Sequence, residues 1–336
     1  MTLEASASPD PIRALGLCSG GLDSMLSALV LRDQGIHVEW INFETPFFNA
    51  DKARNAARLT GVPLHVLNIT EDYLAMLAAP RAGFGKNMNP CMDCHALMFR
   101  KAGEFMQAHG FDFLFSGEVL GQRPMSQTAS SLRYVAKHSG FADRILRPLS
   151  AQRLPETPME EQGLVDRGRL LDLSGRSRKP QIALAAHYGI TDYPAPAGGC
   201  LLTDPGYSRR LKDLMDHDSQ LAPGALHLLQ HGRHMRLNPT TKIVVGRTQQ
   251  DNEQLAQLYD PQHDLLLKTN GRPGPTVIMP GGGSREMVFL AAAICAGYSK
   301  APETSPTPIQ VSGAGRDDTI SVLPVLPEEA RRFLIT

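Results

Sequence analysis

The sequence predicts an α/β protein in which a doubly wound parallel sheet precedes a smaller α+β domain. Through the first half, apolar strand-like runs alternate with helical patterns, at spacings that require parallel strands and right-handed crossovers. A Pro- and Gly-rich stretch at residues 193–199 interrupts this alternation. Beyond it, short helices and strands mix without the same regularity. We therefore expect one domain over residues 12–199 and a second over residues 200–336.

Apolar periodicity predicts the individual elements. In the first half, strands are expected at residues 14–18, 37–43, 63–69 and 111–115, and helices at 24–32, 50–59, 94–109 and 181–188. Residues 150–180 have little periodicity and indicate a long connection. In the second half, helices are expected at 208–215, 249–259 and 284–296, and strands at 242–245, 264–267 and 276–279. A linker at 301–308 is then expected to precede a final strand and helix.

Composition excludes several classes of protein. Of 336 residues, 42% are hydrophobic and 20% are charged, which is typical of a globular chain rather than a disordered one. The longest apolar stretches are shorter than the roughly 20 residues of a membrane span, and residues 1–11 lack the pattern of a secretory signal. We therefore expect a cytoplasmic protein with no membrane partner. The net charge is zero, but residues 121–180 carry 11 basic and 6 acidic side chains, a footprint for phosphates or a solvated loop region.

A six-residue loop, SGGLDS at residues 19–24, joins the first predicted strand to the first predicted helix. Glycines let the backbone approach phosphate oxygens, and the helix N-terminus turns its N–H groups toward negative charge. The loop has no lysine, so it is not a Walker A loop. An aspartate beside phosphates requires a bridging Mg²⁺. The candidate phosphate-binding residues are Ser19, Gly20, Gly21, Asp23 and Ser24. The alternative is an ordinary tight turn with Ser24 as the N-cap.

This loop resembles the pyrophosphate loop of the ATP pyrophosphatase superfamily, the PP-loop or adenine nucleotide alpha-hydrolase proteins. The resemblance implies ATP and Mg²⁺ as cofactors and a catalytic role for Asp23. It also implies cleavage between the α and β phosphates: a substrate oxygen is adenylated, and a nucleophile then displaces AMP. The superfamily includes GMP, NAD and argininosuccinate synthetases as well as tRNA-thiolating enzymes, so the loop alone leaves the substrate open.

Cysteines narrow that choice. Cys91 and Cys94 stand three residues apart in NPCMDCH, at the start of a predicted helix, a position that lowers the pKa of a thiol and exposes its sulfur. The segment is similar to the Asn-Pro…Cys stretch of tRNA 2-thiouridylases, which implies that Cys94 is catalytic. Cys200 follows 106 residues after Cys94, beside a Gly-Gly pair, and the resemblance implies that it is the second catalytic cysteine. The other thiols, Cys18 and Cys295, are expected to be core residues.

Three arrangements of these thiols remain open. Cys94 and Cys200 can act as a pair, in which one carries a persulfide and the other resolves it. Alternatively, Cys91, Cys94 and Cys200 ligate three irons of a [4Fe–4S] cluster whose fourth iron binds the sulfide to be transferred. The resemblance to cluster-dependent tRNA thiolases favours this second arrangement. The third is a structural zinc site with His95 as the fourth ligand.

A polar segment at residues 116–127 follows the predicted strand at 111–115, so it lies at the ligand edge of the sheet. It is similar to the Gly-Glu-Ser-Leu-Gly-Gln…Ser-Gln segment of tRNA 4-thiouridine synthases, with one extra residue near Arg123. The resemblance implies that it lines the ATP site and the uridine pocket, and that the adenosine lies after the second strand. The candidate nucleotide contacts outside the PP-loop are Phe43, Thr45, Gly117, Glu118, Gln122 and Gln127. The alternative is a polar loop that ends in the N-cap of the next helix.

The prediction is an ATP-dependent tRNA uridine sulfurtransferase. Residues 200–336 resemble the small RNA-binding domain fused to such enzymes, and the basic segment at 174–180 either grips RNA phosphates or is a solvated loop. The expected partners are tRNA and a sulfur donor, either sulfide or a persulfide carrier protein, and a homodimer is compatible. The alternatives are a PP-loop adenylating ligase or amidotransferase acting on a small metabolite, and a non-catalytic RNA-binding adaptor. Whether C2 or C4 of the uridine takes the sulfur stays open.

Overall fold

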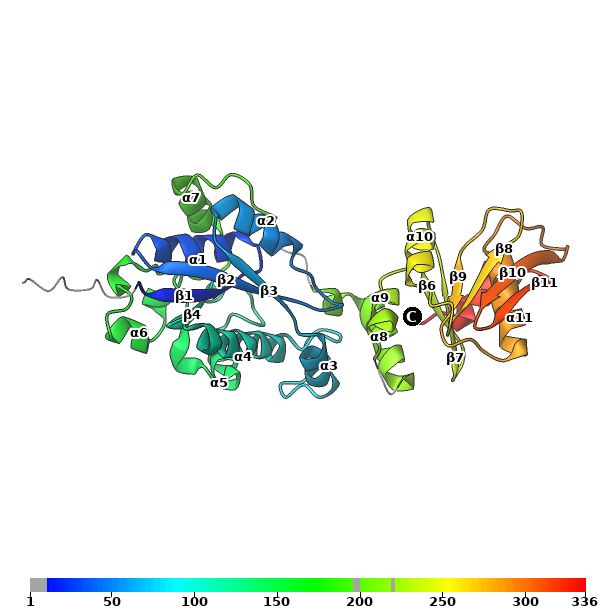
Figure 1. Ribbon diagram of the computed structural model, residues 1–336, viewed down its shortest axis with the longest axis horizontal. Coiled ribbons are helices and arrows are strands. Elements are labelled where there is room, and N and C mark those ends of the chain that lie inside the picture. The colour runs from blue at the N-terminus through cyan, green and yellow to red at the C-terminus, as the bar shows by residue number, and fades with distance from the viewer. Residues whose placement is uncertain (1–10, 196–199, 219–220) are drawn as a thin grey trace, which may run out of the picture. The chain divides into compact units, whose positions relative to one another are not determined.

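The computed structural model describes residues 11–195, 200–218 and 221–336 (Figure 1). The chain divides into two compact units, Met1–Cys200 and Leu201–Thr336, and each has its own hydrophobic core. The Gly-Gly pair before Cys200 lies outside the described residues, as do residues 1–10 of the segment that was compared with a secretory signal. No helix in the described ranges is both long enough and apolar enough to span a membrane.

The N-terminal unit is built on a five-stranded sheet in the order β3-β2-β1-β4-β5. Its strands are β1 (Arg13–Leu17), β2 (His37–Glu44), β3 (Leu64–Asn68), β4 (Phe113–Ser116) and β5 (Ile145–Leu146). Every pairing in the sheet is parallel. The prediction of a doubly wound parallel sheet is therefore confirmed. Because all five strands run the same way, the residues that follow them gather at one edge.

Helices cover both faces of this sheet (Figure 1). One face carries α1 (Leu22–Arg32), α2 (Asp51–Thr60) and α7 (Lys179–His187), and the other carries α3 (Thr70–Ala78), α4 (Cys91–His109) and α5 (Ala129–Ser139). The short α6 (Pro158–Glu161) lies within the long connection expected at 150–180. Fully buried side chains of the strands, such as Trp40, Phe113 and Phe115, form the core between the layers.

The C-terminal unit contains a separate six-stranded antiparallel sheet in the order β11-β10-β8-β9-β7-β6. Its strands are β6 (Arg233–Asn238), β7 (Thr241–Val245), β8 (Leu265–Thr269), β9 (Val277–Met279), β10 (Thr307–Gly313) and β11 (Arg316–Val322). Its helices are α8 (Pro205–His217), α9 (Pro223–Leu228), α10 (Gln249–Leu258), α11 (Arg285–Gly297) and α12 (Pro327–Ala330). The predicted α+β class of this unit is thus observed.

Strand alternation explains how this sheet holds helices on both faces. Ile243 and Val245 on β7 point into the same core as α11, whereas Val244 between them packs with Leu255 of α10. Each face therefore buries one set of apolar side chains. Side-chain caps fix where two of the helices begin: Thr248 accepts from the Asp251 N–H at 3.1 Å, and Ser284 does the same for Met287 at 3.4 Å.

Some elements differ from expectation. The strand expected at 63–69 ends at Asn68, and the chain turns at once into α3, which the short apolar pattern did not separate from the strand. The linker expected at 301–308 gives way to β10 at Thr307. The alternation of buried and exposed side chains along β10 marks an edge hairpin with β11.

Candidate functional site at the carboxyl edge of the parallel sheet

The SGGLDS loop leaves β1 and enters α1, as the sequence predicts. Gly20 has a left-handed backbone, with φ +71°, and an added Cβ would lie 2.2 Å from the carbonyl carbon of Lys52 at the start of α2. Only glycine fits there. The Ser24 hydroxyl donates to the Gly21 carbonyl at 2.7 Å, and the Gly20 N–H donates to the Cys18 sulfur at 3.3 Å. The loop is therefore shaped by its own bonds and by the neighbouring helix.

Asp23 in this loop has one satisfied carboxylate oxygen and one unsatisfied oxygen. Gln122 Nε2 donates to Oδ2 at 2.9 Å, whereas Oδ1 is buried and has no hydrogen-bond partner among the described residues. Burial raises the pKa of Asp23, against the hydrogen bond from Gln122 and the charges of Arg178 and Arg123. A buried carboxylate oxygen without a partner is costly, and a divalent cation would satisfy it. The chemistry of this group therefore fits Mg²⁺.

Other unsatisfied polar atoms are linked to the same loop. Gln181 Nε2 donates to Gln122 Oε1 at 3.3 Å, while Gln181 Oε1 and Arg178 Nε are buried without partners in the part of the chain that the structure describes. Asn42 Nδ2 donates to the Cys18 carbonyl, and its own Oδ1 is also unsatisfied. Several orphaned polar atoms around one glycine loop indicate a polar ligand. Sequence reasoning missed Asn42 because it lies inside a predicted strand.

The basic segment at 174–180 packs against the polar segment at 116–127 and lies near Asp23 of the SGGLDS loop. The Gly175 N–H donates to the Leu120 carbonyl at 2.7 Å, and the charge of Arg178 acts on Asp23. Arg178 is therefore a candidate for the phosphates of the nucleotide, a role that its sequence context did not distinguish from RNA binding.

The polar segment at residues 116–127 packs directly on the PP-loop. A Cβ added at Gly117 would come within 2.4 Å of the carbonyl carbon of Asp23, so this glycine allows the two backbones to touch. Gln122 then reaches Asp23 with its side chain. Gln127 is buried, and its Oε1 has no partner among the described residues. Gly117, Gln122 and Gln127 therefore remain candidates for contact with the nucleotide.

Glu118 in the same segment points to the thiols instead. Its buried carboxylate accepts hydrogen bonds from Arg147 Nε at 2.9 Å and from the Ser116 hydroxyl at 3.1 Å, and its Oε1 lies 3.1 Å from His95 Nδ1. Burial alone would raise the pKa of Glu118, but Arg147 and His95 lower it to about 2. The sequence predicts that Glu118 contacts the nucleotide. In the structure, both of its carboxylate oxygens are instead bonded to neighbouring side chains.

His95 links Glu118 to Cys91, because it contacts both side chains. The two residues are four apart on α4, so their side chains meet on one helix face, and they are hydrogen-bonded. Burial opposes protonation of His95, but Cys91 and Glu118 raise its pKa to about 10. Burial likewise opposes ionisation of Cys91, but the hydrogen bond and charge of His95 outweigh it and lower the pKa of that thiol. A side-chain hydrogen bond with Ser126 adds to this effect.

Cys94 behaves differently from Cys91. Burial raises the pKa of Cys94, and the nearby Cys200, Cys91 and Asp93 raise it further, while a hydrogen bond with Tyr73 opposes the shift. The expectation that the helix start lowers the pKa of both thiols is therefore wrong for Cys94. The physical reason is that Cys94 lies against the buried Tyr73, where a thiolate loses its hydration.

Cys200 is exposed, and its charge acts on both Cys94 and Tyr73. Cys91 and Cys200 thus both lie within electrostatic range of Cys94 and of Tyr73. Among the described residues, however, no group of three or more His, Cys, Asp or Glu side chains is arranged to hold a metal ion. Cys91 is instead hydrogen-bonded to His95, and Cys94 to Tyr73.

Phe43 and Thr45 lie at the end of β2. Phe43 is buried in the sheet, paired with Leu67 of β3. The Thr45 N–H donates to the Phe48 carbonyl at 3.0 Å, and its hydroxyl accepts from the Phe47 N–H at 3.1 Å. The predicted adenosine contact at Phe43 is therefore a core position, and Thr45 shapes the turn that follows.

Comparison with known proteins divides the chain in two. Residues 12–153 match the family described as thiamine biosynthesis protein (ThiI), and residues 232–334 match the NFACT protein RNA binding domain. The chain therefore contains one region similar to the ThiI family, the ThiI-family domain at residues 12–153, and a separate region similar to the NFACT RNA-binding domain at residues 232–334. The PP-loop and both cysteines of α4 lie in the ThiI-family domain, whereas Cys200 lies between the two matches.

Relatives of the ThiI-family domain have names that refer to tRNA. The tRNA-specific 2-thiouridylase MnmA of Sulfurimonas denitrificans is 31% identical over 112 residues, which are 30% of this chain and 33% of that protein. A probable tRNA sulfurtransferase of Acholeplasma laidlawii is 30% identical over 149 residues, 41% of this chain and 34% of that protein. The chain thus spans about a third of the length of these relatives.

Solved structures resemble the chain more distantly. A predicted subunit of a tRNA methyltransferase from Methanocaldococcus jannaschii has a TM-score of 0.34 and 16% identity, over 52% of this chain and 76% of that one.

Proposed function

We propose that the protein is an ATP-dependent tRNA uridine sulfurtransferase. One observation carries the proposal: the segment at residues 116–127 contacts Asp23 of the PP-loop through Gly117 and Gln122, and contacts Cys91 through Ser126. A nucleotide-activating loop and a sulfur site are therefore joined by a single short segment. A thiolating enzyme needs this proximity, because the activated carbon must meet sulfur before water reaches it.

The first step is adenylation. Uridine oxygen attacks the α-phosphate of ATP, the bond between the α and β phosphates breaks, and pyrophosphate leaves. Loop N–H groups and Arg178 receive the phosphates, and Asp23 Oδ1 would hold Mg²⁺, which neutralises the leaving group. Gln122 keeps the Asp23 carboxylate oriented.

The second step is sulfur transfer. When the donor is a persulfide carrier protein, the Cys94 thiolate attacks the outer sulfur of the carrier persulfide, which gives a Cys94 persulfide and releases the carrier thiol. When the donor is sulfide, the sulfide itself attacks the activated carbon and displaces AMP, and no persulfide forms. The remaining steps follow the persulfide route. The terminal sulfur attacks the activated carbon, the carbon–oxygen bond breaks, and AMP leaves. Cys200 then attacks the Cys94 sulfur, which releases the thiouridine and leaves a disulfide between the two cysteines for an external thiol to reduce. Cys91, with its lowered pKa, lies beside this pair.

A [4Fe–4S] cluster on Cys91, Cys94 and Cys200 is the second candidate for the sulfur site. The electrostatic coupling of the three thiols supports it, and their present bonds to His95 and Tyr73 do not. Iron and acid-labile sulfide analysis of protein purified without oxygen separates the two candidates. Four irons per chain, lost in Cys91→Ala, would favour the cluster, whereas iron-free protein that thiolates would favour the thiol pair.

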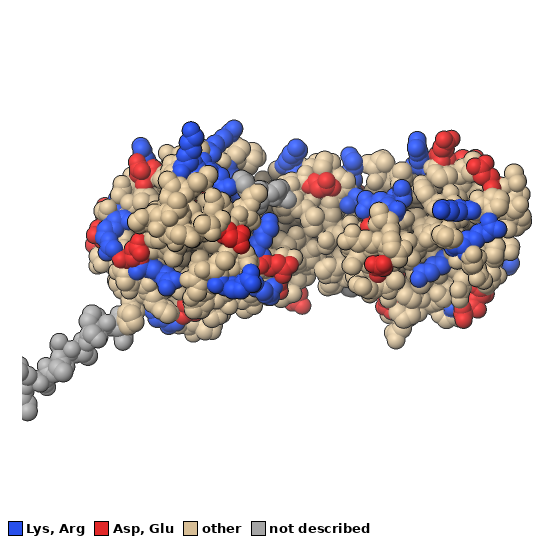
Figure 2. Space-filling model, turned by 90° about the horizontal axis from the view of Figure 1, so that it is seen from above, with Lys and Arg blue, Asp and Glu red and all other residues tan. Residues whose placement is uncertain are grey.

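The acceptor is proposed to be tRNA. Relatives of the ThiI-family domain are named for tRNA, and the C-terminal unit matches an RNA-binding domain. Basic and acidic side chains are interspersed over the face that Figure 2 shows, in keeping with a net charge of zero. Capture of tRNA is therefore expected to depend on local sites rather than on the overall charge.

The test is pyrophosphate release from ATP when tRNA is added. The parent protein should release it, Asp23→Ala should reduce it to background, and Cys200→Ala should release it without forming a thionucleoside. Cys295→Ala, in the core of the other unit, is the matched thiol control and should behave like the parent. Release that ignores tRNA would point to a ligase for a small metabolite, and binding of tRNA without release would point to an adaptor.

A further inference from the structure

A cavity lies in the ThiI-family domain, among α3, α4 and α5, and the proposed reaction does not use it. Its volume is about 240 Å³. Three of the side chains that line it can carry positive charge: Arg81, which follows α3, Arg100 on α4 and His138 on α5. Two others are acidic, Asp72 and Asp93. The question is which of these charges is available to a ligand.

Both acidic side chains already have partners. Asp72 forms a salt bridge with Lys101 at 2.8 Å. The buried Asp93 accepts from the Ala82 N–H at 2.7 Å and from the Tyr134 hydroxyl at 2.8 Å, one bond on each carboxylate oxygen. Asp93 therefore ties the loop after α3 and helix α5 to α4, while the charge of Asp72 is paired with Lys101. Neither carboxylate forms a salt bridge with Arg81 or Arg100, although Asp93, whose donors are neutral, keeps its negative charge at the cavity wall.

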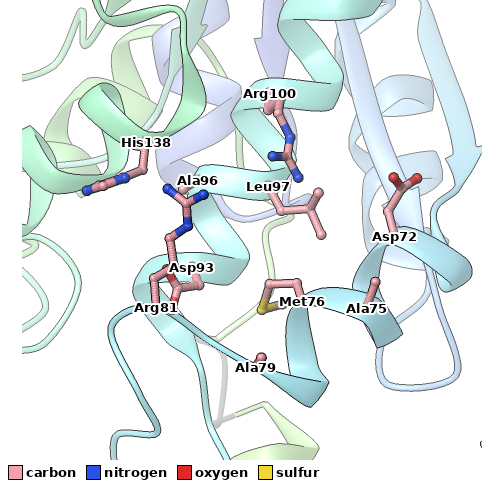
Figure 3. Close-up of a pocket in the computed structure, with 10 residues that line it drawn as sticks. All are labelled: Asp72, Ala75, Met76, Ala79, Arg81, Asp93, Ala96, Leu97, Arg100 and His138. Atoms are coloured by element: carbon pink, nitrogen blue, oxygen red, sulfur yellow. The ribbon is translucent and has the colours of Figure 1, made fainter.

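The two arginines have no such partners. The guanidinium groups of Arg81 and Arg100 form no hydrogen bond or salt bridge with any residue that the structure describes. Figure 3 shows both guanidinium groups pointing toward the space beside Ala96 and Leu97. Two guanidinium groups from different elements, whose N–H donors have no acceptor among the described residues, thus converge on one cavity with an apolar floor. Guanidinium groups bind phosphate oxygens through paired N–H donors, and an apolar floor suits the sugar carbons next to a phosphodiester.

The cavity adjoins the sulfur site. Asp93, which lines it, lies in the first turn of α4 between Cys91 and Cys94. A polynucleotide that presents a uridine to these thiols has neighbouring phosphates within reach of the same turn of helix.

We propose that Arg81 and Arg100 bind a backbone phosphodiester of the RNA whose uridine is modified. The site is separate from the PP-loop, and it positions the RNA without contacting the reacting atoms. This inference rests on the proposed function for the identity of the RNA.

The test compares tRNA binding by the full-length protein and by Arg81→Ala, Arg100→Ala and the double variant, at several salt concentrations. Arg133→Ala is the matched control, because Arg133 is exposed on α5 and does not line the cavity. Its guanidinium group makes no hydrogen bond or salt bridge with the described residues. If both arginines hold one phosphate, the slope of log affinity against log salt should fall by roughly 0.7–0.9 in the double variant. The losses of tRNA-binding free energy in the two single variants should sum to more than the loss in the double variant, because both arginines contact the same phosphate.

Phosphate ethylation of the tRNA locates the contact. One ethylated phosphate should weaken binding to the parent and not to the double variant. The proposal is overturned if the double variant keeps the affinity and salt slope of Arg133→Ala, or if the same ethylated phosphates weaken both proteins. Thiolation of tRNA by the parent protein distinguishes failure of this site from failure of the proposed function. If the parent thiolates tRNA and the double variant binds tRNA normally, only the phosphate site is refuted. If the parent neither binds nor thiolates tRNA, the proposed function is refuted as well.

Discussion

Glu118 connects the two halves of the candidate site at the scale of single residues. It lies in the segment that packs on the PP-loop, yet its carboxylate is bonded to Arg147 and faces His95, the partner of Cys91. Both Glu118 and Arg147 are less than a tenth exposed, so neither charge can be solvated if the other is removed. The pair is therefore a positioning element for the thiol site as well as a structural one.

Replacement of Glu118 by glutamine should destabilise the N-terminal unit by about 3–5 kcal/mol, because it leaves the Arg147 charge buried and unpaired. Glu44→Gln is the control: Glu44 also pairs with an arginine, Arg54, at 2.8 Å, but that arginine is half exposed. Its loss should cost about 0–1 kcal/mol. Urea unfolding measures both values, and equal costs would show that the Glu118 pair is not buried in solution.

Lys242 is a buried cation of the C-terminal unit. Burial and the charge of Arg236 lower its pKa to about 8, against the attraction of Asp213. In the unfolded chain the pKa returns to about 10.5, so between these values the unfolded state binds the extra proton. The free energy of unfolding should therefore rise as the pH increases from 8 to 10.5, by up to about 3 kcal/mol.

Lys242→Met isolates this effect. The difference in unfolding free energy between the parent and the variant should favour the variant near pH 7 and move in favour of the parent as the pH approaches 10.5. A difference that stays constant over this range would contradict the depressed pKa of Lys242.

At the scale of elements, the PP-loop depends on the contact between its backbone and the first turn of α2. Gly20 and Gly35 share a left-handed backbone, with φ of +71° and +80°, but only Gly20 has a neighbour within reach of an added Cβ. The pair therefore separates the cost of backbone conformation from the cost of the close approach.

Gly35→Ala should cost about 1–2 kcal/mol of stability, the penalty of a left-handed residue with a Cβ, and should retain tRNA-dependent pyrophosphate release. Gly20→Ala should lose that release, because the loop must move away from Lys52. The pyrophosphate assay and urea unfolding of both variants measure this, and full activity of Gly20→Ala would rule out the observed loop as the nucleotide site.

The sequence predicts elements well where local pattern and tertiary role agree. The strand–loop–helix around residues 19–24 follows from an apolar run, two glycines and a helical period, all of them local. The helix at 94–109 is found, although it begins three residues earlier, at Cys91. By contrast, α3 follows β3 without a turn signal, and β10 lies where prolines and threonine suggested a linker. These elements depend on packing partners that are distant in the sequence.

Side-chain roles in the site are predicted less completely than the motifs. The residue spacing brings Cys91 and His95 to one face of α4, but it does not reveal that Glu118 bonds to His95 rather than to a nucleotide. Nor does it distinguish Arg178 as a neighbour of Asp23 from Arg178 as an RNA contact. Both distinctions depend on how the loops after β4 and before α7 fold against each other.

At the scale of the whole molecule, the chain consists of two units with separate cores. Calorimetry should therefore resolve two unfolding transitions. ATP with Mg²⁺ should raise only the transition of the N-terminal unit, because a ligand stabilises the unit that it binds. Lys242→Met should shift only the other transition. A single cooperative transition that responds to both changes would show that the units fold together.

Mass spectrometry of tRNA nucleosides tests the central claim most directly. A strain that lacks the gene should lose one thionucleoside that the parent strain contains. The wild-type gene and the Cys295→Ala variant should restore it, and Asp23→Ala and Cys94→Ala should not. A nucleoside profile unchanged by the deletion, or restored by Cys94→Ala, would contradict tRNA thiolation through the site at the carboxyl edge of the sheet.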